Sequence, residues 1–195
     1  MNEYNQALNL FNIKSYNKAF DVFLGLDCLY ECGYCKFLLG DIDAALNFWK
    51  QDKIDSPAIN WGLNLIDIVQ LTVPTNLTFF QIRNFLERDM QLLFETGQLK
   101  MLENIMSACD ILAEFNPESY KFIGRVLLNN GYFDLSNEFL QKALMICYSD
   151  CEVHFLLAQY YLFKQEFTEA KKILKKSIKI NSGYFPAKKL LAEIQ

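Results

Sequence analysis

The sequence predicts an all-α protein built of antiparallel helix pairs. Apolar residues recur at helical spacing along the chain, and no alternating run is long enough to indicate a sheet. The 195 residues include only four prolines and eight glycines, which lie between the periodic segments. In the C-terminal part, one pattern of large and small residues returns after 34 positions, a length typical of a repeated helix–turn–helix unit. We therefore expect about twelve helices, stacked as successive pairs.

The internal repeat rests on six positions in each copy. The first copy contains Ile123, Gly124, Phe133, Ser136, Leu140 and Ala143, and the second contains Leu157, Ala158, Phe167, Ala170, Leu174 and Ser177. This pattern resembles the tetratricopeptide repeat (TPR), whose helix pairs stack into a right-handed α-solenoid. The resemblance implies two clear TPR-like repeats and a C-terminal capping helix over residues 116–195.

The N-terminal part shows a weaker form of the same pattern. The residues that resemble second-helix positions are Tyr16, Ala19 and Phe23, and then Ile42, Ala45 and Trp49. Gly33 matches the small residue of the preceding helix, where two helices approach closely. Pro57 can begin a closing helix, because the first turn does not use the N–H that proline lacks. We expect TPR-like helices with a closing helix over residues 1–71.

The middle of the chain departs from the repeat. Residues 72–76, with the sequence Thr-Val-Pro-Thr-Asn, give the strongest turn signal and are predicted to form a bend or linker. Residues 77–115 are predicted to form an irregular pair, with helices over 77–95 and 98–114. Two arrangements fit this pattern: two short stacks, each closed by one helix, or one continuous superhelix that bends at Pro74. We favour the continuous arrangement.

Composition limits the class of protein and of partner. The formal net charge is −4, so the chain as a whole does not attract nucleic acid or anionic membrane. It shows no secretory leader and no apolar stretch near the ~20 residues of a membrane span. We expect a cytoplasmic protein with six reduced cysteines, without nucleic acid and without membrane insertion. Residues 116–195 hold 11 Lys and Arg against 8 Asp and Glu, and we interpret their lysine-rich helix as a solvated face.

The resemblance also implies where a partner would bind. In this family the first helix of each pair lines a concave groove that holds a peptide or a helix. By position, the partner-binding residues are expected to be Tyr30, Tyr34, Phe37, Lys121, Arg125, Leu128, Phe155, Gln159 and Phe163. Some relatives use a Lys, Asn and Arg cluster to clamp the C-terminal carboxylate of a chaperone. The asparagines of that clamp are missing here, so Lys121 and Arg125 indicate only a looser contact with an acidic partner.

Two groups of possible metal ligands have helical spacing. They are Cys28, Cys32 and Cys35, and then Cys147, Cys151 and His154. A zinc site requires four ligands, usually from tight turns, whereas Cys32 and His154 occupy packing positions of the repeat, so we expect no metal and no cofactor. The chain has one histidine and shows no Gly-rich phosphate loop and no nucleophile elbow, which predicts that it is not an enzyme.

The sequence thus predicts a non-catalytic scaffold or adaptor that binds a peptide or helix of another protein in a concave groove. Three alternatives stay open. The chain could be a chaperone that shields an apolar segment of a secreted or assembling client, a cysteine-based metal-binding protein, or a homodimer whose groove holds a helix of the second copy.

Overall fold

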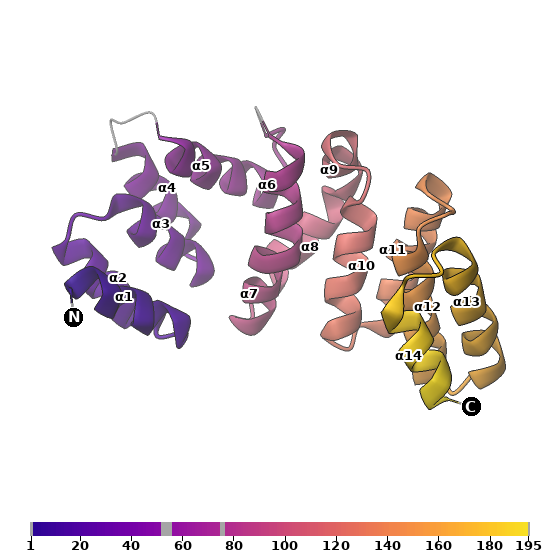
Figure 1. The fold of residues 1–195 in the computed structure, drawn as a ribbon. Coiled ribbons are helices and arrows are strands. Elements are labelled where there is room, and N and C mark those ends of the chain that lie inside the picture. The colour runs from indigo at the N-terminus through magenta and orange to yellow at the C-terminus, as the bar shows by residue number, and fades with distance from the viewer. Residues whose placement is uncertain (1, 52–55, 75–76, 195) are drawn as a thin grey trace. The chain divides into compact units, whose positions relative to one another are not determined.

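The computed structural model describes residues 2–51, 56–74 and 77–194, and within these ranges every regular element is a helix (Figure 1). Close contacts divide the chain into two compact units. The N-terminal unit comprises Met1–Gln81 and Asp89–Ala108, and the C-terminal unit comprises Ile82–Arg88 and Cys109–Gln195. No helix in the described ranges combines the length and the apolar character that crossing a membrane requires.

The N-terminal unit begins with two helix pairs and a closing helix. These are α1 (Glu3–Asn12), α2 (Tyr16–Gly25), α3 (Leu29–Leu38), α4 (Ile42–Gln51) and α5 (Pro57–Val69). Pro57 lies in the first turn of α5, and the Ser56 hydroxyl caps that turn by accepting a hydrogen bond from the Ile59 N–H at 3.2 Å. The closing helix predicted after Pro57 is therefore present.

The Trp49 side chain of α4 packs between α3 and α5. Its ring is fully buried and fills the space beside Gly33 of α3 and Gly62 of α5. A Cβ atom at Gly33 would lie 2.3 Å from Trp49 Nε1, and one at Gly62 would lie 2.5 Å from Trp49 Cδ2. Both positions therefore require glycine, because a protein interior is too closely packed to absorb such an overlap. The small residue predicted at position 33 is explained by this contact.

The middle of the chain differs in detail from the prediction. A single helix over residues 79–95 consists of α6 (Phe79–Asn84), the π-helical segment η1 (Phe85–Asp89) and α7 (Met90–Glu95). The helix predicted over 98–114 is broken at Ala108 into α8 (Leu99–Ser107) and α9 (Cys109–Phe115), so the described residues form one helix more than expected. Of the predicted bend at 72–76, residues 75 and 76 lie outside the described residues.

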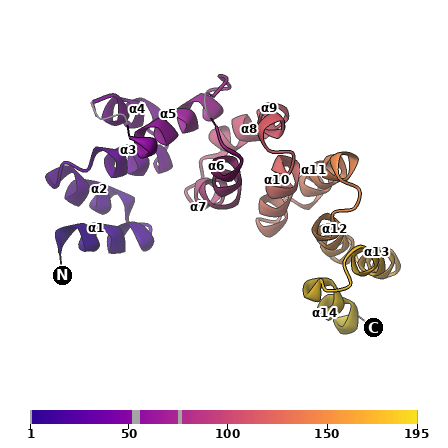
Figure 2. The same cartoon turned by 45° about the horizontal axis from the view of Figure 1, so that its top comes forward.

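The C-terminal unit contains two regular hairpins and a last helix. They are α10 (Ser119–Asn129) with α11 (Phe133–Ile146), α12 (Cys151–Phe163) with α13 (Phe167–Ile180), and then α14 (Phe185–Glu193). Figure 2 shows the helices of each hairpin side by side, with α14 next to the second hairpin. The predicted stack of antiparallel helix pairs with a C-terminal capping helix is confirmed.

At the small residues of the repeat, the two helices of each hairpin approach each other closely. A Cβ atom at Gly124 of α10 would lie 2.8 Å from Leu140 Cδ2 of α11. The Ser136 hydroxyl donates to the Gly124 carbonyl at 2.7 Å, and the Ser177 hydroxyl donates to the Cys151 carbonyl at 2.7 Å. Because these serines are buried, their hydrogen bonds satisfy groups that would otherwise be costly to bury.

Candidate functional site

The aromatic residues expected to line the N-terminal groove stack on one another. Tyr30, Tyr34 and Phe37 of α3 form an aromatic ladder with ring centroids 6.1 Å and 6.3 Å apart in successive pairs. Phe11 of α1 stacks on Tyr34 at 5.7 Å, and Trp49 of α4 lies 6.1 Å from Phe37. The ladder is thus held between side chains of its own unit.

Two further observations show that the aromatic ladder belongs largely to the core. Phe37 has 0% of its surface exposed, and Tyr30 and Tyr34 are half-buried. The Tyr34 hydroxyl donates to the carboxylate of Asp89, which is itself buried. The expectation that Phe37 lies on an open groove is wrong, because Trp49 and its neighbours cover it. Tyr30 and Tyr34 keep part of their surface, and their role in partner binding stays a prediction.

The two basic residues expected in the groove of α10 are already matched by carboxylates. Lys121 has a side chain that is 8% exposed, and its Nζ contacts Glu118, Asp150 at 2.9 Å and Glu152 at 3.4 Å. Burial alone would lower the pKa of Lys121, but hydrogen bonds to Glu118 and Asp150 outweigh it and raise that pKa above its ordinary value. The ammonium group of Lys121 is therefore a fixed part of the fold at neutral pH.

Arg125 extends this arrangement by one helical turn. Its guanidinium reaches Glu87 at 3.0 Å and Glu152 at 3.1 Å. Together with Lys121, the residues form a polar network that consists of Lys121, Arg125, Glu87, Glu118, Asp150 and Glu152. Glu87 also pairs with Arg83 at 3.1 Å, so the four carboxylates still outnumber the three cations that they contact, and the network offers no unmatched positive charge. The looser contact with an acidic partner, expected at Lys121 and Arg125, receives no support from this geometry.

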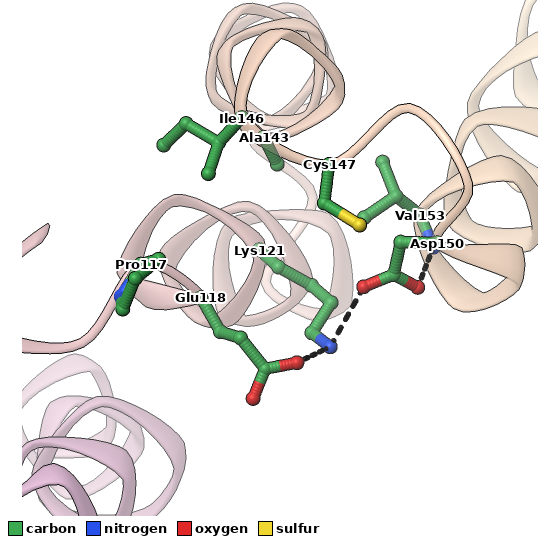
Figure 3. A pocket seen from close by; sticks show the side chains of 8 residues that line it. All are labelled: Pro117, Glu118, Lys121, Ala143, Ile146, Cys147, Asp150 and Val153. Atoms are coloured by element: carbon green, nitrogen blue, oxygen red, sulfur yellow. Dashed lines mark hydrogen bonds and ion pairs between the residues drawn. The ribbon is translucent and has the colours of Figure 1, made fainter.

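A small pocket lies beside the polar network, between the start of α10, the end of α11 and the start of α12 (Figure 3). Its volume is ≈ 90 Å³, and it is lined by Pro117, Glu118, Lys121, Ala143, Ile146, Cys147, Asp150 and Val153. Cavities of about 150 Å³ are needed to hold benzene, so this one has room only for waters or a short side chain. Asp150 at its edge also caps α12 by accepting from the N–H groups of Glu152 and Val153.

The face of α12 is the part of the expected groove that stays partly open. Phe155, Gln159 and Phe163 follow one another at four-residue intervals, and the first two are half-buried. Phe163 is 52% exposed and stacks on Phe133 with ring centroids 3.4 Å apart. Phe155 makes an edge contact with Tyr184 at 5.7 Å, at the entrance to α14. We call these three residues, with Leu162, the α12 face.

Leu128 of α10 does not share this openness. It is only 7% exposed, so the expectation that it lies on an open groove is wrong. Leu128 is one of nine residues of the eleven-residue helix α10 that are buried. Because α10 packs against both α11 and α12, little of it is left to contact a partner.

The candidate metal ligands differ in exposure. Cys32, Cys35 and His154 are buried, Cys28 and Cys151 are half-buried, and Cys147 is exposed. All six cysteines are free thiols, and burial raises the pKa of Cys32 to about 11 and that of Cys35 to about 12. Such thiols are poor nucleophiles and poor ligands at neutral pH, because the thiolate is the reactive form. Among the described residues, no three His, Cys, Asp or Glu side chains come together in a way that could hold a metal ion.

The polar network and the pocket were missed by the sequence interpretation. The pairing of Glu118 with Lys121 could have been found, because the two residues are three apart on one helix. The contacts of Lys121 with Asp150 and of Arg125 with Glu87 span 29 and 38 residues, so no local pattern indicates them. Cys147, expected only as a possible metal ligand, instead lines the pocket.

Comparison with known proteins gives a match to one family model. The model of the tetratricopeptide repeat matches residues 152–184, which span α12 and α13. No curated protein matches the chain. Among solved structures, the C-terminal part of a TPR repeat-containing protein from Cytophaga hutchinsonii is 17% identical, with a TM-score of 0.49 over 98% of this chain and 69% of that chain.

Two further solved structures are similar over nearly their whole length. YrrB, described as a TPR protein with an unusual peptide-binding site, is 16% identical with a TM-score of 0.42 over 99% of this chain and 91% of that chain. A thermophilic TPR protein of Thermus thermophilus is 18% identical with a TM-score of 0.42 over 98% of this chain and 96% of that chain. The family match confirms the resemblance found in the sequence: the α12–α13 hairpin is a tetratricopeptide repeat.

Proposed function

We propose that this protein is a non-catalytic scaffold that binds a segment of another protein along the α12 face. Stacked TPR hairpins present extended surfaces that hold protein or peptide partners. The observation that carries the proposal is that α12 has no charged residue on its partly exposed side beyond the first turn. Its residues from Val153 to Phe163 include no Asp, Glu, Lys or Arg, whereas a helix on the surface of a protein normally places charges toward water.

The neighbouring helix α13 shows what the usual pattern is. It buries Ala170, Leu174 and Ser177 and turns lysines toward solvent. On α12 the partly exposed positions hold Gln159, Leu162, Phe163 and other aromatic or aliphatic side chains, and Phe155 keeps part of its surface although it also packs against the core around Ala158. A helix whose partly exposed side is mostly apolar gains stability when a further surface covers that side.

The composition of the α12 face indicates the kind of segment that fits it. Phe155, Leu162 and Phe163 would bury the apolar side of a helix or of an extended segment. The amide of Gln159 can both donate and accept a hydrogen bond, so it can pair with polar groups of the partner. The free cysteines support a reducing setting, and we place the protein in the cytoplasm.

The test compares two exposed phenylalanines. Phe163→Ala removes an aromatic anchor from the α12 face, and Phe80→Ala removes a 71%-exposed ring from α6 as a matched control. Tagged wild type and both variants, checked by circular dichroism, are used to capture proteins from lysate of the source organism. The retained protein is then purified and its affinity is measured by calorimetry. We expect Phe163→Ala to weaken binding about tenfold or more and Phe80→Ala to leave it unchanged.

Two results would contradict the proposal. One is that the wild type retains no protein above the background of the tag alone. The other is a captured partner whose affinity is reduced equally by both variants, or by Phe80→Ala alone. Retention of a partner with loss only in Phe163→Ala would support a binding site on the α12 face.

A further inference from the structure

One side of α13 carries a row of three lysines. Lys171, Lys175 and Lys179 are four residues apart, which places them along one stripe at steps of about 6 Å. We call them the lysine row. Within the described part of the chain none of the three has an ion pair, although Lys172 beside them pairs with Glu169 at 2.9 Å. Lys175 and Lys179 are exposed, and Lys171 is half-buried.

The three ammonium groups of the lysine row repel one another along the helix. Like charges at i and i+4 destabilise a helix, and a glutamate at the middle position would instead pair with both neighbours. The polar network of the same unit shows the opposite pattern, because there every cation contacts at least two carboxylates. The repulsion among these positive charges decreases when an anionic surface binds to them.

We propose that the lysine row docks an acidic segment of a partner protein. This inference goes beyond the proposed scaffold function, since it concerns the outer side of α13 and not the α12 face. Carboxylates that recur at one-turn intervals along an acidic helix would match the spacing of the row. Charge complementarity of this kind mainly increases the rate of association and the selectivity for the partner.

Two other anions fit the row less well. The helices α13 and α14 contain no arginine, which is the side chain that binds phosphates through two parallel hydrogen bonds. Ala170, Leu174 and Ser177 are buried, so the apolar side of α13 is not available for insertion into a lipid surface.

The test measures binding of a fluorescent decaglutamate peptide by anisotropy. Lys175→Glu reverses the middle charge and creates two favourable i, i+4 pairs, so it should weaken binding without lowering the melting temperature. Lys18→Glu on α2 gives the same change of net charge at an exposed position in the other unit. We expect Lys175→Glu to weaken binding about tenfold and Lys18→Glu to leave it nearly unchanged. Raising salt from about 0.02 M to about 0.15 M should weaken wild-type binding.

Several outcomes would overturn the inference. The peptide would show no saturable binding at low salt, or both charge reversals would weaken it equally, which would indicate a response to net charge alone. Tighter binding to oligouridine, or to vesicles that contain phosphatidylserine, with the same loss in Lys175→Glu, would assign the row to another class of ligand. If Lys175→Glu fails to fold, Lys175→Gln repeats the comparison with a smaller change of charge.

Discussion

The first helices α3 and α12 carry aromatic residues at comparable positions, yet only one of them keeps an open face. The aromatic ladder of α3 is held between Phe11 and Trp49, and Phe37 is completely covered. On α12, Tyr184 meets Phe155, while Phe163 stays 52% exposed. Predicted groove residues therefore lie largely in the core of one unit and on a partly open face of the other, and the difference depends on which side chains the neighbouring helices place against them.

Trp49 is the side chain that contributes most to the packing of the aromatic ladder in the N-terminal unit. Besides its two glycine contacts, its Nε1–H donates to the Tyr30 carbonyl at 3.1 Å. Trp49→Ala should lower the free energy of unfolding by about 3–5 kcal/mol, because it leaves a large cavity and removes the end of the aromatic ladder. Urea denaturation followed by circular dichroism measures this effect.

The matched comparison for Trp49 is Phe163→Ala on the α12 face. Since Phe163 is half exposed, its truncation should cost about 1 kcal/mol or less. If the two variants lost similar stability, the contrast between a closed face on α3 and an open face on α12 would be refuted.

Lys121 should give the second largest effect. Lys121→Met keeps most of the buried length of the side chain but leaves Glu118, Asp150 and Glu152 close together without their shared cation. We expect a loss of about 1–3 kcal/mol in the free energy of unfolding, since all three carboxylates keep partial contact with water. Chemical denaturation at neutral pH measures the loss.

The control for Lys121 lies in the lysine row. Lys175→Met changes the same residue type in the same unit, but the side chain is exposed and has no ion pair among the described residues. Its stability should change by less than about 0.5 kcal/mol. Equal losses in the two variants would show that the polar network contributes no more than an ordinary surface lysine.

The hairpins could be predicted from the sequence because their determinants are local and periodic. Gly124 and Ser136 recur as small residues after one repeat length, and the structure places them where α10 and α11 touch. The burial of Phe37 could not be predicted in the same way. It depends on Trp49, which belongs to the next helix, and a spacing pattern on α3 contains no information about what that helix brings.

The same limit applies to the polar network and to the middle helix. A cation at Lys121 looks available from sequence, because two of its three carboxylate partners lie about one repeat away. The π-helical segment Phe85–Asp89 has no propensity signal of its own, so a regular helix was the natural expectation there. The positions of helices and hairpins can thus be predicted from the sequence. Whether a side chain is exposed to a partner depends on contacts with residues far away in the sequence.

Substitution of His154 should have the smallest effect on the free energy of unfolding. This effect depends on pH and concerns the C-terminal unit, which contains the histidine. Its ring is 1% exposed and its Nε2 lies 2.9 Å from the Tyr148 carbonyl. Burial lowers the pKa of His154 below its ordinary value of 6.5, and the nearby Lys176 lowers it further, while Tyr148 and Asp150 oppose the shift. The unfolded chain therefore binds a proton at a pH where the folded chain does not.

This difference in proton uptake makes the folded C-terminal unit less stable as the pH falls. The stability that neutral His154 provides is complete above pH 6.5 and decreases as the pH falls from 6.5 toward the folded-state pKa. Because the chain has one histidine, His154→Gln should flatten this part of the pH profile, as measured by urea denaturation at several pH values. The N-terminal unit, which contains no histidine, should not follow the same dependence. Parallel profiles for wild type and variant would show that His154 is as accessible to protons in the folded chain as in the unfolded one.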